Sequence, residues 1–169
     1  MSLLIRKIEK AKWLQNDIIN GQIPSADAIT NCTKTSRNTL STWEIDSVSN
    51  INNAVIALLC GQEHLDTIDI VYFEPEKISE RGISIEATEG RTSFAIMKEK
   101  HRNLSQLDYE KLGTIAEIII EEIKSNRDVR FSVGKQKEIL RQAIKNGLIS
   151  IESLNIGISD KLKEGKDSV

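Results

Sequence analysis

The chain has few residues of several kinds, and each shortage excludes a class of protein. Only two of its 169 residues are cysteines and two are prolines, which excludes a disulfide-stapled scaffold and a proline-rich fibre. No apolar run approaches the roughly 20 residues of a membrane-spanning helix, and the first residues lack the apolar region of a secretory signal. Two histidines leave little material for an imidazole-rich metal site. We therefore expect a cytoplasmic protein without membrane segment, metal or cofactor.

What is present fits one ordinary folded domain. Apolar residues make up 39% of the chain and charged residues 28%, which excludes a disordered or fibrous protein. A chain of 169 residues is long enough to bury a core without covalent staples. We predict a single domain over residues 1–158 and a loose C-terminal tail over 159–169, where charge is dense and no apolar period is visible.

A long helix near residues 106–125 is the strongest single feature. Its apolar residues recur at steps of three and four, at Leu112, Ile115, Ile119 and Ile123. Ser105, followed three positions later by Asp108, has the spacing of a helix-capping pair. We expect this helix to be central to the fold and covered on most of its sides.

Strand-like runs lie on both sides of a second predicted helix. Residues with β-forming side chains and alternating polarity occur near 39–45, 66–73, 83–88 and 92–98. The turn candidate Glu89-Gly90-Arg91 joins the last two runs into a predicted hairpin. Further helices are predicted near 50–60 and over 132–146. This order favours the α+β class, with a small, mainly antiparallel sheet packed against the long central helix.

Two segments have more than one interpretation. Residues 2–20 favour an amphipathic helix that ends at Asn20-Gly21, but the run Leu3 to Ile8 also fits an opening strand. The polar passage after Pro24 fits either a short helix capped by Ser25 or the first arm of a hairpin. Both alternatives stay open.

The formal net charge of −2 conceals an uneven distribution of charge. Ten acidic residues lie between Glu44 and Glu89 against two basic ones, a local balance of −8, whereas residues 127–145 have a balance of +4. One interpretation is a set of solvated strand edges and helix faces with internal ion pairs. The other is an acidic surface that steers a basic partner.

Five residues are candidates for binding a protein partner. Arg37 and Asn38 lie in a hydroxyl-rich segment over residues 35–45, and Glu44, Glu86 and Glu89 belong to the acidic block. Hydroxyl and amide side chains beside a strand suit a recognition edge, although the same residue types favour turns and strand surfaces. Trp43, on the apolar side of that strand, is expected in the core.

A second candidate site would bind an anion. Lys100, His101 and Arg102 come just before the expected start of the central helix, where cations and the positive end of the helix would meet. Arg91, in the predicted hairpin turn, would extend this site toward a nucleotide or the substrate of a small enzyme. The plain alternative is a basic connecting loop.

The basic helix 135–145 offers a third possibility, contact with nucleic acid. Its cations would meet phosphates while Gln136 and Gln142 reach bases. The acidic chain, the scarcity of aromatic residues and the lack of a helix-turn-helix partner argue against this reading and favour a solvated outer face.

No catalytic spacing of residues is visible, and the sequence names no substrate. We therefore predict a small cytoplasmic, non-catalytic protein that binds a protein partner, such as a subunit, an adaptor or a toxin-neutralising immunity-type protein. The acidic central block, suited to a basic partner, is the main support for this prediction. The identity of the partner and the oligomeric state do not follow from the sequence.

Overall fold

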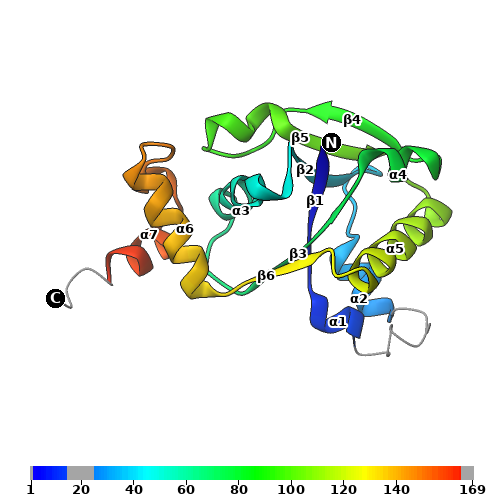
Figure 1. Cartoon of the computed structure of the whole chain (residues 1–169), viewed down its shortest axis with the longest axis horizontal. Helices are drawn as coiled ribbons and strands as arrows, with labels where there is room; N and C mark the ends of the chain where they lie inside the picture. The colour runs from blue at the N-terminus through cyan, green and yellow to red at the C-terminus, as the bar shows by residue number, and fades with distance from the viewer. Residues whose placement is uncertain (1, 15–24, 165–169) are drawn as a thin grey trace.

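The structure is a computed structural model that describes residues 2–14 and 25–164. It is a single α+β domain built on a six-stranded antiparallel sheet, in the order β4-β5-β2-β1-β3-β6 (Figure 1). The strands are β1 (Leu3–Ile8), β2 (Leu40–Ile45), β3 (Ile68–Phe73), β4 (Ser84–Thr88), β5 (His101–Ser105) and β6 (Asp128–Phe131). The predicted fold class and the mainly antiparallel sheet are therefore confirmed.

Helices cover both faces of the sheet (Figure 1). On what we call the first face lie α3 (Ile51–Cys60), α6 (Val133–Lys145) and α7 (Ile156–Lys163), with the 3₁₀ turns η2 (Val48–Asn50), η3 (Ala95–Lys100) and η4 (Ile151–Ser153). On the second face lie α1 (Lys10–Leu14), α2 (Ala26–Cys32), α4 (Pro75–Glu80) and α5 (Tyr109–Lys124). Each face has its own apolar core.

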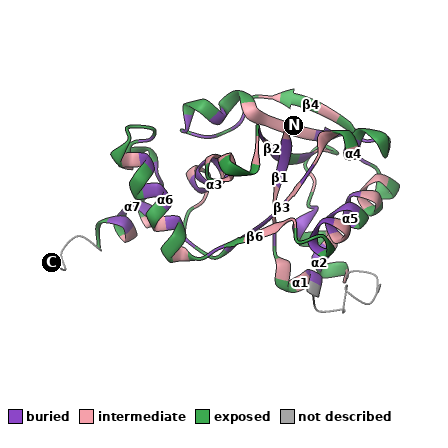
Figure 2. Ribbon diagram, in the orientation of Figure 1, coloured by how far each residue is buried: buried purple, intermediate pink, exposed green. Residues whose placement is uncertain are grey.

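The two cores follow from the two-residue period of the strands. In β1, Leu3 and Ile5 belong to the core on the first face, whereas Leu4 and Ile8 belong to the core on the second. Figure 2 shows β1 and β3 as mostly buried and β4 as exposed or intermediate along its length. The strands at the middle of the sheet are thus apolar on both faces, as strands covered by two helical layers must be.

The long helix α5 packs on the second face and keeps the predicted apolar stripe. Ile115, Ile119 and Ile123 are buried on it. Its cap differs from the prediction: Asp108 accepts a hydrogen bond from the Lys111 amide at 2.9 Å, whereas Ser105 ends strand β5. The predicted helices near 50–60 and 132–146 are confirmed as α3 and α6, and Ser132 caps the latter.

The preferred reading of residues 2–20 as one helix is wrong. Leu3–Ile8 is a strand between β2 and β3, and only Lys10–Leu14 is helical, while 15–20 lie outside the described residues. Pairing on both sides outweighs the local helical period, because the sheet buries both faces of the run at once. After Pro24, the helix alternative is confirmed: Ser25 accepts from the Ala28 amide at 3.2 Å and caps α2.

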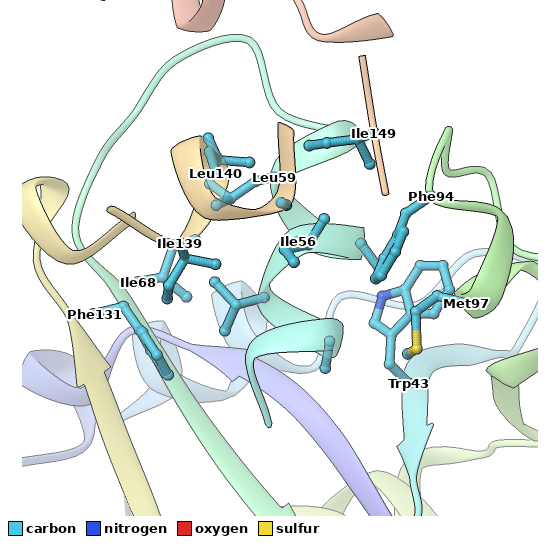
Figure 3. Packing of buried hydrophobic residues seen from close by; sticks show 14 of the residues in the cluster. Trp43, Ile56, Leu59, Ile68, Phe94, Met97, Phe131, Ile139, Leu140 and Ile149 are labelled. Atoms are coloured by element: carbon cyan, nitrogen blue, oxygen red, sulfur yellow. The ribbon is translucent and has the colours of Figure 1, made fainter. Parts of the chain in front are cut away.

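The strand predicted at 92–98 is also wrong. Ala95–Lys100 forms the 3₁₀ turn η3, and the partner of β4 is His101–Ser105. Phe94 and Met97, three residues apart, both point into the first core, where Figure 3 shows them next to Trp43. The hairpin therefore closes through a long loop over 89–100.

Three further elements escaped prediction. The short edge strand β6 lies between α5 and α6, and α4 begins at Pro75, just after the strand predicted at 66–73. Helix α7 continues to Lys163 with Leu162 buried, so the first residues of the expected tail over 159–169 are folded against the first core. Residues 165–169 lie outside the described residues.

Gly90 is the tightest point of the long loop. A Cβ atom there would lie 2.4 Å from Cη2 of Trp43 and 3.0 Å from Cβ of His101. Its amide donates to the Lys98 carbonyl at 2.8 Å, so the loop is held closely against the tryptophan. Only a residue without a side chain fits between them.

We predict opposite effects of alanine at two glycines. Gly90→Ala should lower the free energy of unfolding by about 1–3 kcal/mol, because the methyl group overpacks the Trp43 ring. Gly113→Ala, on the exposed side of α5 with no atom within 4 Å of the new Cβ, should raise it by about 0.5–1 kcal/mol. Urea denaturation of both variants measures the difference; a neutral Gly90→Ala would contradict the packing described here.

Candidate functional site

A groove of about 690 Å³ lies on the part of the first face that the helices leave open. Its floor is formed by β1, β2 and β5, and its walls by the end of α3, the turn at 36–39 and the loop that follows β4. Polar and charged side chains from these elements, among them Lys7, Arg37, Thr88, Arg91, His101 and Asn103, line it. Pockets of this size commonly hold small molecules.

Register brings the polar floor together. Asn103 on β5 lies opposite Ser41 on β2, and Ile5 on β1 lies opposite Trp43. Continuing the same register by two residues places Lys7 opposite Ser41. A polar row therefore crosses three neighbouring strands on the open part of the first face.

The turn at 36–39 presents Arg37 at the rim of the groove. Arg37 and Asn38 both have left-handed backbone conformations, with φ of 53° and 57°. The Ser36 amide donates to the Thr39 carbonyl at 3.1 Å and the Thr39 amide to the Ser36 carbonyl at 3.0 Å, which makes a tight two-residue turn of the primed type. Such a turn prefers asparagine and glycine, so Arg37 occupies its position at some cost in backbone strain.

Trp43 is a core residue, as expected, and it fixes the position of His101. Its side chain is 7% exposed, and its ring centroid lies 4.9 Å from that of His101 in an edge-on arrangement with an interplanar angle of 73°. Nδ1 of His101 lies 2.7 Å from the Thr88 hydroxyl. Burial, and secondarily the nearby charge of Arg102, lowers the pKa of His101, so this side chain is neutral at pH 7.

The predicted anion site at Lys100, His101 and Arg102 lacks the helix start on which the prediction relied. Lys100 ends the 3₁₀ turn η3, and His101 and Arg102 begin strand β5 instead of a helix, so the positive end of α5 does not lie beside them. Lys100 pairs with Asp46 at 3.0 Å and Arg102 with Glu44 at 2.5 Å. Of the predicted anion-binding residues, the groove brings together only His101 and Arg91.

The acidic block is distributed over several elements. Four of its ten acids are in ion pairs: Glu44, Asp46, Asp69 and Glu74. Glu63 and Asp66 lie between α3 and β3, Glu76 and Glu80 lie on α4, and Glu86 and Glu89 lie on β4 and just after it. Because pairing cancels part of the charge, the field of this block is weaker than the sequence balance implies.

Strand β4 forms one edge of the sheet, and a second hollow lies beside its end. The hollow has a volume of about 660 Å³ and is lined partly by Ala87, Glu89, Ile96 and Glu99. The side chain of Ile96 is 56% exposed, which is unusual for a large apolar residue. Glu86 is exposed on the strand itself and accepts a hydrogen bond from the Ser105 hydroxyl at 2.6 Å.

The basic helix α6 uses part of its surface for internal contacts. It packs on α3 through Ile139 and Leu140, and Arg141 donates to the Leu162 carbonyl of α7 at 3.2 Å. Lys135 pairs with Glu138 on the same helix at 2.9 Å. These contacts reduce the number of cations that a nucleic acid would meet.

Residues 2–14 and 25–164 contain neither a metal-binding cluster nor a membrane-spanning helix. No group of three or more His, Cys, Asp and Glu side chains in these ranges is arranged to hold a metal ion. No helix in the same ranges is both long and apolar enough to cross a membrane. Comparison of the chain with protein-family models, curated proteins and solved structures finds no match.

Sequence reasoning missed Lys7 and Asn103 as residues of the groove. The position of Lys7 could have been predicted, because the alternation of a strand over Leu3–Ile8 places it on the same face as Leu3 and Ile5. Asn103 carries no such signal, since its neighbours depend on the pairing of β5 with both β2 and β4. The groove is therefore a product of the topology.

The lowered pKa of His101 predicts a pH dependence of stability. The unfolded chain binds the histidine proton more strongly than the folded protein does, so the free energy of unfolding should fall as the pH drops from about 7 through 6.5 toward the lowered folded pKa. Urea denaturation at pH 7.5 and pH 5.5 should show a smaller loss in His101→Gln than in the wild type. The His64→Gln variant serves as control and should keep the wild-type loss; an unchanged loss in His101→Gln would refute the assignment.

Proposed function

We propose that the protein is a non-catalytic binding protein that receives an extended, basic segment of a protein partner along the edge of β4. The observation that carries this proposal is the combination of an exposed edge strand with a hollow containing the exposed Ile96. Two free cysteines, Cys32 and Cys60, support a reducing compartment such as the cytoplasm as its place of action.

An edge strand offers a partner unused hydrogen-bonding groups. Among the described residues, β4 pairs only with β5, so the outward amides and carbonyls of Ser84 to Thr88 have no strand beside them. A segment of another chain can continue the sheet by pairing with these groups. The backbone supplies affinity in this mode, and side-chain pockets supply specificity.

The chemistry around β4 favours a basic segment with an apolar side chain. Glu86, Glu89 and Glu99 lie on or near this edge, and Lys98 is the cation that lines the same hollow as Glu89 and Glu99. Their charges would speed the encounter with a basic segment. Ile96 and the hollow beside it would hold an apolar side chain of that segment and slow its release.

Charge reversal on β4 tests the proposal. Peptides selected from a random display library on the wild-type protein should be rich in lysine and arginine. Their association rate should fall by roughly tenfold or more with Glu86→Lys plus Glu89→Lys, because the steering field is reversed. Glu76→Lys plus Glu80→Lys on α4 makes the same change in net charge at exposed positions and should have a smaller effect.

A second pair of variants tests the apolar contact by surface plasmon resonance. Ile96→Lys should raise the dissociation rate, whereas Ile156→Lys, at a residue 74% exposed elsewhere on the surface, should leave it unchanged. Equal binding by the β4 variants and their controls would sink the proposal, as would selected peptides without basic residues.

A further inference from the structure

We propose that the groove on the first face binds a phosphorylated small molecule of about the size of a mononucleotide. This site would recognise an anionic small molecule, whereas the edge of β4 would recognise a basic segment of a protein. It does not rest on the proposed function.

The first support is a local excess of positive charge in a chain whose formal net charge is −2. The cations Lys7, Arg37 and Arg91 line the groove together with Glu89, and Glu86 lies opposite Asn103 on the same face of the sheet. Among the described residues, none of these three cations has an ion-pair partner within 4.0 Å, whereas Lys100 and Arg102 nearby are both paired. Unpaired cations gathered around one hollow favour an anionic ligand.

The second support is the strained position of Arg37. A left-handed conformation suits asparagine or glycine, and arginine gains nothing there for folding. The turn is also fixed to the segment before α5, because the Asn38 carbonyl accepts a hydrogen bond from the Leu107 amide at 3.0 Å. The turn thus places the exposed Arg37 side chain at the rim of the groove, and guanidinium is the side-chain group that best matches phosphate oxygens.

The third support is a polar atom without a partner in the floor. The side-chain oxygen of Asn103 is buried and has no hydrogen-bond partner among the described residues. Buried polar atoms of this kind are rare in folded proteins and call for a donor. A rotation of the Asn103 amide toward the groove would bring this oxygen within reach of a hydroxyl or amino group of a ligand.

The geometry also limits the kind of ligand. Arg37 lies at one end of the groove, just before β2. Arg91 lies at the other end, next to Gly90, which packs against Trp43. At roughly 3.3 Å per residue along β2, the two ends are about 13 Å apart. Lys7 lies between these two ends. Glu89 and the last carbonyls of α3 near Gly61 disfavour a molecule that is anionic throughout. A phosphomonoester whose other end carries hydroxyl or amino donors satisfies both requirements.

Titration of the full-length ¹⁵N-labelled protein with three probes, followed by NMR, tests the proposal. Adenosine monophosphate should shift the amide signals of residues around Arg37, Arg91 and Asn103 and saturate below about 10 mM, the weak end of specific affinity. Inorganic pyrophosphate should shift the signals beside the cations only. Adenosine, which lacks the phosphate, should bind at least roughly tenfold more weakly.

Two sets of variants separate a built site from a general charge effect. Arg37→Gln with Arg91→Gln should weaken the binding of adenosine monophosphate by roughly tenfold or more, while Lys124→Gln with Lys145→Gln, exposed cations on α5 and α6, should leave it unchanged. Arg37→Asn should weaken binding and yet raise the midpoint of thermal unfolding by about 2 °C, because asparagine tolerates the turn.

The outcomes that overturn the proposal are specific. It fails if none of the phosphates shifts the groove signals at about 10 mM, or if adenosine binds as well as its monophosphate. It also fails if the two double variants behave alike, since binding would then reflect net charge only. Loss of peptide binding at β4 would not affect any of these results, so the two proposals fail independently.

Discussion

The burial of both faces of β1 is the constraint on which the rest of the structure depends. Its residues Leu3 to Ile5 pair with β2 on one side and Leu4 to Ile8 with β3 on the other, and its apolar side chains enter two different cores. Each core needs its own layer of helices, so the chain must supply α5 with α2 and α4 on one face and α3 with α6 and α7 on the other (Figure 1). The groove lies on the part of the first face that α3, α6 and α7 do not cover.

The two basic residues of β1 show how the sheet treats charge on its two faces. Arg6 points to the second face and donates to the Cys32 carbonyl at 2.8 Å and the Ser41 carbonyl at 2.8 Å, which ties α2 to the sheet. Burial lowers the pKa of Arg6 to about 10, and these carbonyls compensate part of that cost. Lys7 points to the first face and reaches the groove. Arg6 is thus used in structural hydrogen bonds, whereas its neighbour Lys7 lines the groove.

Local signals in the sequence predicted most of the fold but little of the groove. Helices α3 and α6 were predictable because the apolar period and the end signals of each helix lie within about a dozen neighbouring residues. Ser132, which caps the start of α6, is such a signal. The run over Leu3–Ile8 was misjudged because its apolar residues fit both the helical and the strand period. Strand β6 was missed because its four residues are too few to show a period. The groove depends on strand register, which is decided by contacts far apart in the sequence, and on the left-handed turn at Arg37, which an arginine does not signal.

The two proposed binding regions meet at the end of β4. Thr88 and Glu89 border both the groove and the hollow beside Ile96, and the Thr88 hydroxyl contacts His101 in the groove. If a partner strand on β4 shifts these residues, it changes the affinity of the groove for its ligand, and the ligand must change the affinity for the partner by the same factor. Gly90, wedged against Trp43, limits such a shift because the loop cannot move without repacking the first core. The coupling between the two regions is therefore set by how rigidly the loop over 89–91 is packed.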